Sequence, residues 1–246
     1  MDFLAHTAHW QFLGLLVGCL AWILTLATAG INEWRLWHVD DVSVVTSGVA
    51  WVGIWRACFN SHILTEAESC QSVGISDAFV PAEVKAAQVM MVLAMLCGLA
   101  GNVGGGLALR LVYFSLEERG KVRPLFLLTG SLYVLTGALT SVPLVWNMAA
   151  VLNNATIHFP PRFHLPAAPA NQQVGVAIGL GLFASILMLI SGMLFLCYRH
   201  VWRSLNTPGD PRHGPWTPSG LAEGSGRAKE DVRGRNNPSF HADHVS

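Results

Sequence analysis

The hydrophobic residues of this chain gather in four long stretches that contain no Asp, Glu, Lys or Arg. These stretches cover residues 10–32, 86–109, 124–161 and 163–198. A helix needs about 20 apolar residues to cross a bilayer, and each stretch is longer than that. We therefore predict a mainly α membrane protein with helices over residues 12–31, 86–109, 125–151 and 174–198, packed as a left-handed four-helix bundle.

Positive charges are distributed unevenly between the segments that flank and join these helices. Residues 110–124 and 199–246 contain eleven Lys and Arg residues, whereas residues 32–85 and 152–173 contain four. Because cytoplasmic segments are the ones enriched in Lys and Arg, we expect both termini, residues 1–11 and 199–246, in the cytoplasm together with residues 110–124. Residues 32–85 and 152–173 would then be extracellular.

Composition supports a membrane protein whose last segment differs from the rest. The chain is 52% hydrophobic and only 12% charged, which is unusual for a soluble domain. Residues 199–246 are instead rich in Pro, Gly, Ser and charged residues. Such a segment buries too little apolar surface to offset the entropy of ordering, so we predict a disordered tail.

The segment of residues 32–85 has the pattern of a small antiparallel β-sheet. Its runs LWHV, VSVVT and GVAWVGIW are rich in strand-forming residues, and Asp40 and Asp41 would form a hairpin turn. We expect three or four strands that pack on the membrane helices, since the segment is too short for a core of its own. Cys58 and Cys70 both lie here, on the oxidising side of the membrane, where a disulfide between them would join neighbouring strands.

Three other cysteines and one asparagine are candidates for burial or modification. Cys19 and Cys97 lie inside predicted helices and are expected to be buried thiols. Cys197 lies at the cytoplasmic end of the fourth helix, where it could receive a fatty acyl chain or could simply be a small apolar residue. Asn154 begins the glycosylation pattern Asn-Ala-Thr, but it is so close to the third helix that we expect the site to be unused.

No arrangement of residues suggests catalysis or a cofactor. The predicted helices contain no ionisable residue of the kind that marks a transport pathway. The ten histidines show metal-like spacing only in HADH at residues 241–244, inside the predicted tail, so we assign no metal. We expect a protein that is not an enzyme, with the lipid bilayer and not nucleic acid as its partner.

Spaced residues of the first extracellular segment resemble the signature of the claudin family. Trp34 is followed by Gly53-Ile54-Trp55 and then by Cys58 and Cys70, and the family pattern is Trp, Gly-Leu-Trp and two cysteines. Further similarity is found in VVTS, in VPAEVKAAQVMMV before the second helix, and in RFHLP of the second extracellular segment. The resemblance covers nearly everything except the tail, and the run EWRLWHVDD indicates a divergent member.

The chain departs from the family pattern at four places. Ile54 replaces Leu, which conserves volume. Gln88 stands where the family commonly has an arginine, and Cys197 is single where claudins often have a pair. Claudins usually end in a hydrophobic residue that PDZ domains capture, whereas this chain ends in Val245-Ser246, which weakens the case for a PDZ scaffold as a partner.

The resemblance implies roles for particular residues. Trp34 and Trp55 would anchor the sheet at the outer membrane face, because tryptophan combines an apolar body with one N–H. Gly53 would permit a close approach or an unusual dihedral angle before Trp55. Phe163 and Pro166 would contact the opposing cell, although the prolines around them could also form no more than a rigid turn.

The family also implies a function. Claudins form tight-junction strands, so this chain would reside at cell junctions of the plasma membrane and form homo- or hetero-oligomers with claudins in the same and the opposing membrane. The first extracellular segment is net acidic, which favours cations, but solvated carboxylates explain this equally and we expect a barrier without strong charge preference. The charged residues are Glu33, Asp40, Asp41, Glu66, Glu68, Asp77 and Glu83, against Arg35, Arg56 and Lys85.

Two other functions remain open from the sequence. Calcium-channel gamma subunits, which are auxiliary subunits, share the four-helix plan and the signature, and so do myelin and epithelial-membrane-protein tetraspans. Tetraspanins and connexins fit less well, because the second extracellular segment here contains no cysteine. The RFHLP turn favours a claudin, whereas the ending in Ser246 counts against a strand tied to a scaffold.

Overall fold

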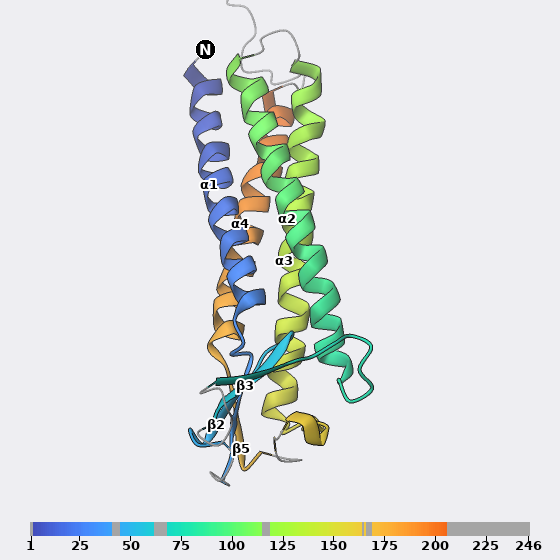
Figure 1. The fold of residues 1–246 in the computed structure, drawn as a ribbon. Helices are drawn as coiled ribbons and strands as arrows, with labels where there is room; N and C mark the ends of the chain where they lie inside the picture. Colours follow the sequence, from blue (N-terminus) through green and yellow to red (C-terminus); the bar gives the residue numbers. More distant parts are fainter. Residues whose placement is uncertain are drawn as a thin grey trace, which may run out of the picture. The chain divides into compact units, whose positions relative to one another are not determined.

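Four long helices form the body of the protein. The structure is a computed structural model that describes residues 2–40, 45–61, 68–114, 119–163, 165 and 169–205. The helices are α1 (Asp2–Gly30), α2 (Ala82–Phe114), α3 (Arg119–Leu152) and α4 (Val176–Leu205), and they lie side by side in Figure 1. Each contains a stretch long and apolar enough to cross a membrane, which confirms the predicted class of fold.

The helices extend beyond the apolar stretches that predicted them. The second begins at Ala82, four residues before the predicted start, and its first turn contains Glu83. The third begins at Arg119 and includes Pro124 and Pro143. The sequence predicts where a helix is apolar, but backbone hydrogen bonding continues into charged turns that lie outside the hydrocarbon layer.

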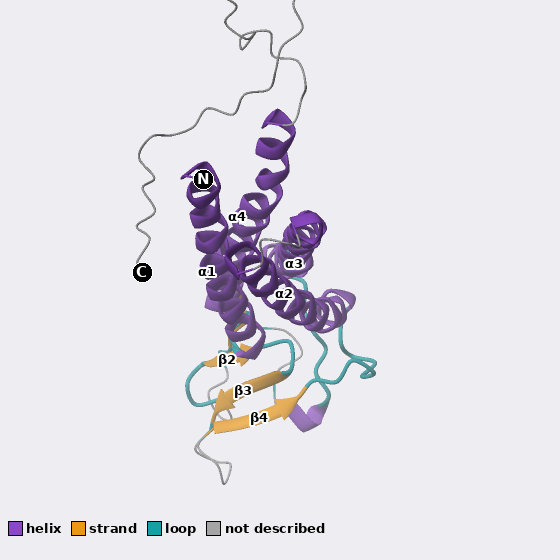
Figure 2. Ribbon diagram, turned by 90° about the horizontal axis from the view of Figure 1, so that it is seen from above, coloured by secondary structure: helices purple, strands orange, loops and turns teal. Residues whose placement is uncertain are grey.

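A five-stranded antiparallel sheet lies at one end of the bundle (Figures 1 and 2). Its strands are β1 (Arg35–His38), β2 (Val49–Val52), β3 (Arg56–Asn60), β4 (Glu68–Ser72) and β5 (Asn171–Val174), in the order β4-β3-β2-β1-β5. The four strands β1 to β4 confirm the expectation of three or four strands in residues 32–85, and the sheet gains a fifth strand, β5, from the segment between α3 and α4. The sequence NQQV of this strand is short and polar, so propensity does not reveal it.

The connection between the first two strands also differs from the expected hairpin. His38 pairs with Val49, so the connection spans residues 39–48 and is not a tight turn at Asp40 and Asp41. Gly48 in this connection has a φ of 65°, a left-handed conformation that glycine adopts without strain. Asp41 and much of the VSVVT run lie outside the described residues.

The two faces of the sheet have different environments. Directly opposite residues of antiparallel strands share a face, so Trp37, Ala50 and Phe59 point the same way, and all three are buried. They join one apolar cluster with Met91 of α2 and other residues at the same end of the bundle. The opposite face contains Leu36, Trp51, Cys58 and Cys70 in one cross-strand row.

The start of α4 is fixed against the end of α1 by a close backbone approach. Gly175 donates from its N–H to the carbonyl of Trp34 at 3.0 Å, and Ala177 donates to the carbonyl of Glu33 at 3.1 Å. A Cβ on Gly175 would overlap the carbonyl oxygen of Glu33. Only glycine therefore lets β5 and α4 meet the chain that leaves α1.

We expect Gly175→Ala to lower the free energy of unfolding by roughly 3 kcal/mol, because the methyl group has no space beside two fixed backbone segments. The measurement is thermal or denaturant unfolding of the purified chain in detergent micelles. Gly179→Ala is the matched control, since a Cβ there would meet nothing within 4 Å. Equal stability of the two variants would contradict the close approach.

Candidate functional site

A buried charged group links the sheet to the helices. Arg35 of β1 is 1% exposed, and its Nη2 donates to Oε1 of Glu83 at 3.0 Å and to Oδ1 of Asn147 at 2.8 Å. The side-chain nitrogen of Asn147 donates in turn to the backbone carbonyls of Glu83 and Pro143, each at 3.0 Å. We call these three residues the Arg35 cluster, and they connect β1 with α2 and α3.

The electrostatics of the Arg35 cluster follow from its burial. Burial lowers the pKa of the Arg35 guanidinium, and the hydrogen bond and negative charge of Glu83 oppose that shift. The group remains charged, since arginine does not lose its proton in proteins. Its Nη1 is buried without a hydrogen-bond partner among the described residues, so the pairing with Glu83 and Asn147 is what compensates its desolvation.

This pairing corrects the reading of Arg35 and Glu83 as surface charges. The two side chains are 1% and 12% exposed and neutralise each other. Asn147 was missed because it lies inside an apolar stretch. A polar amide in a membrane helix is unusual, and that signal would have identified it as a residue with a partner.

The Gly53-Ile54-Trp55 turn is fixed from two sides. Gln88 of α2 is 2% exposed and donates from Nε2 to the carbonyls of Ile54 and Val73, at 2.6 and 3.0 Å. A Cβ on Gly53 would lie 2.8 Å from the Cα of Asn32, so close approach, and not an unusual dihedral angle, is the reason for glycine here. One uncharged amide at residue 88 thus ties the turn and the strand end to the bundle.

Trp34 anchors the sheet through the protein and not through lipid. Its side chain is 1% exposed, and Nε1 donates to the carbonyl of Thr28 in α1 at 3.0 Å. The expectation that this ring lies at the membrane surface is therefore wrong, because no part of it is left to face lipid. Trp55 is half-buried and packs against the same apolar cluster.

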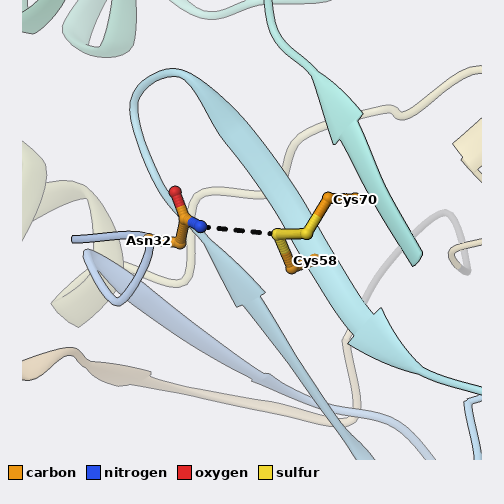
Figure 3. Close-up of a disulfide and its surroundings, with 3 residues drawn as sticks. All are labelled: Asn32, Cys58 and Cys70. Carbon is orange, nitrogen blue, oxygen red and sulfur yellow. Dashed lines mark hydrogen bonds between the residues drawn. A yellow bond between two sulfur atoms is a disulfide. The ribbon is translucent and has the colours of Figure 1, made fainter. Parts of the chain in front are cut away.

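The disulfide lies on the face of the sheet that contains Leu36 and Trp51, which we call the outer face. Cys58 of β3 and Cys70 of β4 are directly opposite in the register and are joined by an S–S bond of 2.09 Å (Figure 3). Cys58 is 1% exposed, and Asn32 directs its side-chain nitrogen at the Cys58 sulfur from 3.5 Å. The bond fixes the register of the last two strands and leaves Cys70 exposed.

Phe163 is a core residue in this structure. It is fully buried, and its ring packs on Phe79 and Phe159 with centroid distances of 5.3 and 5.1 Å. Trp37 extends this group with an edge contact to Phe159 at 5.2 Å. The contact with an opposing cell expected of Phe163 rested on its having no other role, and that premise is wrong. Pro166 lies outside the described residues.

The other candidate residues are scattered. Asn154 is exposed just after the end of α3, with a φ of 53°. Cys197 is exposed near the far end of α4, whereas Cys19 and Cys97 are only half-buried within their helices. Val245 and Ser246 lie outside the described residues. Among the side chains that the structure describes, no group of three or more His, Cys, Asp or Glu could bind a metal ion.

The arrangement defines a class of protein: four membrane-spanning helices with an antiparallel sheet at one end, in which a disulfide joins two strands and a buried ion pair joins the sheet to the helices. A family model described as PMP-22/EMP/MP20/Claudin tight junction matches residues 19–197. This match covers most of the chain, which therefore belongs to that family.

Several claudins are among the characterised proteins that this chain resembles. Human claudin-6 is 26% identical in an alignment of 202 positions that covers 78% of this chain and 82% of the relative. Claudin-2 of Bos taurus is 26% identical in an alignment of 197 positions that covers 76% of this chain and 77% of the relative. Claudin-3 of Rattus norvegicus is 23% identical in an alignment of 189 positions that covers 76% of this chain and 81% of the relative. The similarity supports a tight-junction, multi-pass, claudin-like protein.

We expect Arg35→Met to lower the free energy of unfolding by about 3 kcal/mol, because it leaves the carboxylate of Glu83, which is only 12% exposed, without its partner. Unfolding is again measured in detergent micelles. The double variant Arg35→Met, Glu83→Gln should lose less of its free energy of unfolding than Arg35→Met alone, since no unpaired charge remains. Arg56→Met, at an exposed position of β3, is the control; a loss as large as that of Arg35→Met would show that the buried pair is not the cause.

Proposed function

We propose that this chain is a claudin-type strand protein of the tight junction, with its sheet outside the cell and both termini in the cytoplasm. Copies associate side by side with one another or with claudins in the same membrane, and meet copies in the opposing membrane. The observation that supports this most is the rigid attachment of the stapled sheet to the bundle in a chain with claudin relatives. A rigid sheet presents the same edges in every copy.

Lateral association is supported by the arrangement of the strands. In the described part of the sheet the edge strands are β4 and β5, and both contain polar residues such as Gln71 and Gln173. An edge strand offers backbone N–H and carbonyl groups to another chain. Repeated contacts between unlike surfaces form an open row where the rotation between copies does not close into a ring, and an open row is the geometry of a strand.

The charges of the first segment support a barrier without strong ion preference. The charges of Arg35 and Glu83 neutralise each other inside the protein. The carboxylate of Asp77 accepts from the N–H of Gly74 at 2.9 Å and so serves a turn. Of the charged side chains described there, Glu33, Asp40 and Asp77 remain against Arg56 and Lys85, a net charge of only about −1. This balance favours a seal over a selective pore.

No observation favours the two other functions that the sequence leaves open. The family description includes PMP-22 and EMP proteins, but the similar proteins reported above are claudins. The relatives are junction proteins, and we assign no catalytic role.

The test is expression of the chain in cells that lack junction strands, followed by freeze-fracture imaging and measurement of paracellular conductance. We expect continuous fibrils at cell contacts and a lower conductance without a change in the ratio of sodium to chloride permeability. Cys58→Ser should abolish fibrils, because β3 and β4 lose their crosslink, whereas Cys97→Ser should form them normally. Diffuse surface staining of the unaltered chain would overturn the proposal and favour an auxiliary subunit.

A further inference from the structure

A hollow of about 310 Å³ opens where α1 meets the outer face of the sheet. It is lined by Ile31, Asn32 and Glu33 of the connection after α1, by Trp51 of β2 and by Cys58 of β3. The apolar span of α1 ends at Gly30, one residue before this lining begins. A hollow directly after this span is expected at the level of the lipid headgroups of the adjacent leaflet.

The walls of the hollow are fixed before any ligand arrives. Asn32 packs its Cα against Gly53 and directs its side chain at the Cys58 sulfur (Figure 3). The carbonyl of Glu33 accepts from the N–H of Ala177, and the disulfide fixes Cys58. A preformed site of this kind loses little entropy when it binds.

The side chains of the hollow suit an organic cation. Glu33 has no ion pair or hydrogen bond from its carboxylate within the described structure, although it lies beside a half-buried tryptophan, Trp51. An aromatic face with a nearby negative charge is the environment that binds quaternary ammonium groups. A carboxylate at this depth also disfavours anionic lipids.

A second charge of opposite sign lies on the same face. Arg56 and Cys58 are two residues apart on β3 and so point to the same side of the sheet. Arg56 is exposed and forms no ion pair with any described residue. A negative phosphate next to the bound ammonium would find this guanidinium on the same face of the sheet, two residues along β3 from Cys58.

We propose that the hollow binds the phosphocholine headgroup of a membrane lipid. The quaternary ammonium lies against Trp51 and Glu33, the phosphate faces Arg56, and the acyl chains run along α1 into the bilayer. The site takes choline lipids of the outer leaflet only if the sheet is extracellular, which rests on the proposed function. Binding itself depends only on the fold, so the test below is made on purified protein and does not involve junctions.

The experiment is native mass spectrometry of the full chain purified in detergent and mixed with equal amounts of dioleoyl phosphatidylcholine, phosphatidylethanolamine and phosphatidylglycerol. We expect preferential retention of phosphatidylcholine. Trp51→Leu and Glu33→Gln should each reduce that preference roughly threefold to tenfold. Trp51→Phe should retain most of it, because the aromatic face is kept.

Two control variants test whether the effect belongs to the hollow. Trp146→Leu removes a tryptophan that is 47% exposed on α3, and Asp40→Asn removes an exposed carboxylate of the sheet end. Neither should change the lipid preference. Equal retention of the three lipids by the unaltered chain would overturn the proposal. So would an unchanged preference in Trp51→Leu, or a loss in Trp51→Phe as large as that in Trp51→Leu.

The folded state of each variant is checked by its thermal unfolding in the same detergent. A variant that loses the preference but unfolds at the same temperature as the unaltered chain supports the site. If preference falls only in variants that also unfold early, the phosphocholine assignment is wrong. Failure of this test would leave the freeze-fracture test of the strand-forming function unaffected, and the reverse also holds.

Discussion

The position of the sheet depends on a charged side chain that is buried where β1 meets α2 and α3. Arg35 can be desolvated there only because Glu83 and Asn147 accept its hydrogen bonds, and both come from helices that are fixed in the bundle. Trp34, directly before Arg35, and Trp37, two residues after it, belong to the same core and are also fully buried. Since β1 pairs with both β2 and β5, fixing this one strand orients the central sheet.

The disulfide has a different role from the Arg35 cluster. It joins β3 to β4, which are the strands farthest from β1 on that side of the sheet. It therefore sets the register of the edge and not the attachment of the sheet to the bundle. Gln88 contributes to that attachment through two backbone carbonyls, so the chain needs no charge at this position. An amide suffices because its partners are neutral carbonyl oxygens.

The sequence predicts the helices well and the contacts between segments poorly, for physical reasons. A lipid environment requires long apolar helices, so the four spans are visible in composition alone. The cysteine spacing and the Gly53-Ile54-Trp55 pattern similarly indicate the stapled sheet. In contrast, β5 is four mostly polar residues whose strand conformation arises from pairing with β1. Nor does local sequence show that Phe163 enters the core or that Trp34 is shielded from lipid, because both outcomes depend on segments distant in the chain.

The central claim is that the Arg35 cluster, and not the disulfide, fixes the sheet to the bundle. The most direct measurement is hydrogen–deuterium exchange of the purified chain in detergent, before and after reduction of the Cys58–Cys70 bond. The account predicts that reduction speeds exchange in β3 and β4 while β1 and β5 remain as protected as the adjoining end of α2. Equal loss of protection across all five strands on reduction would contradict it.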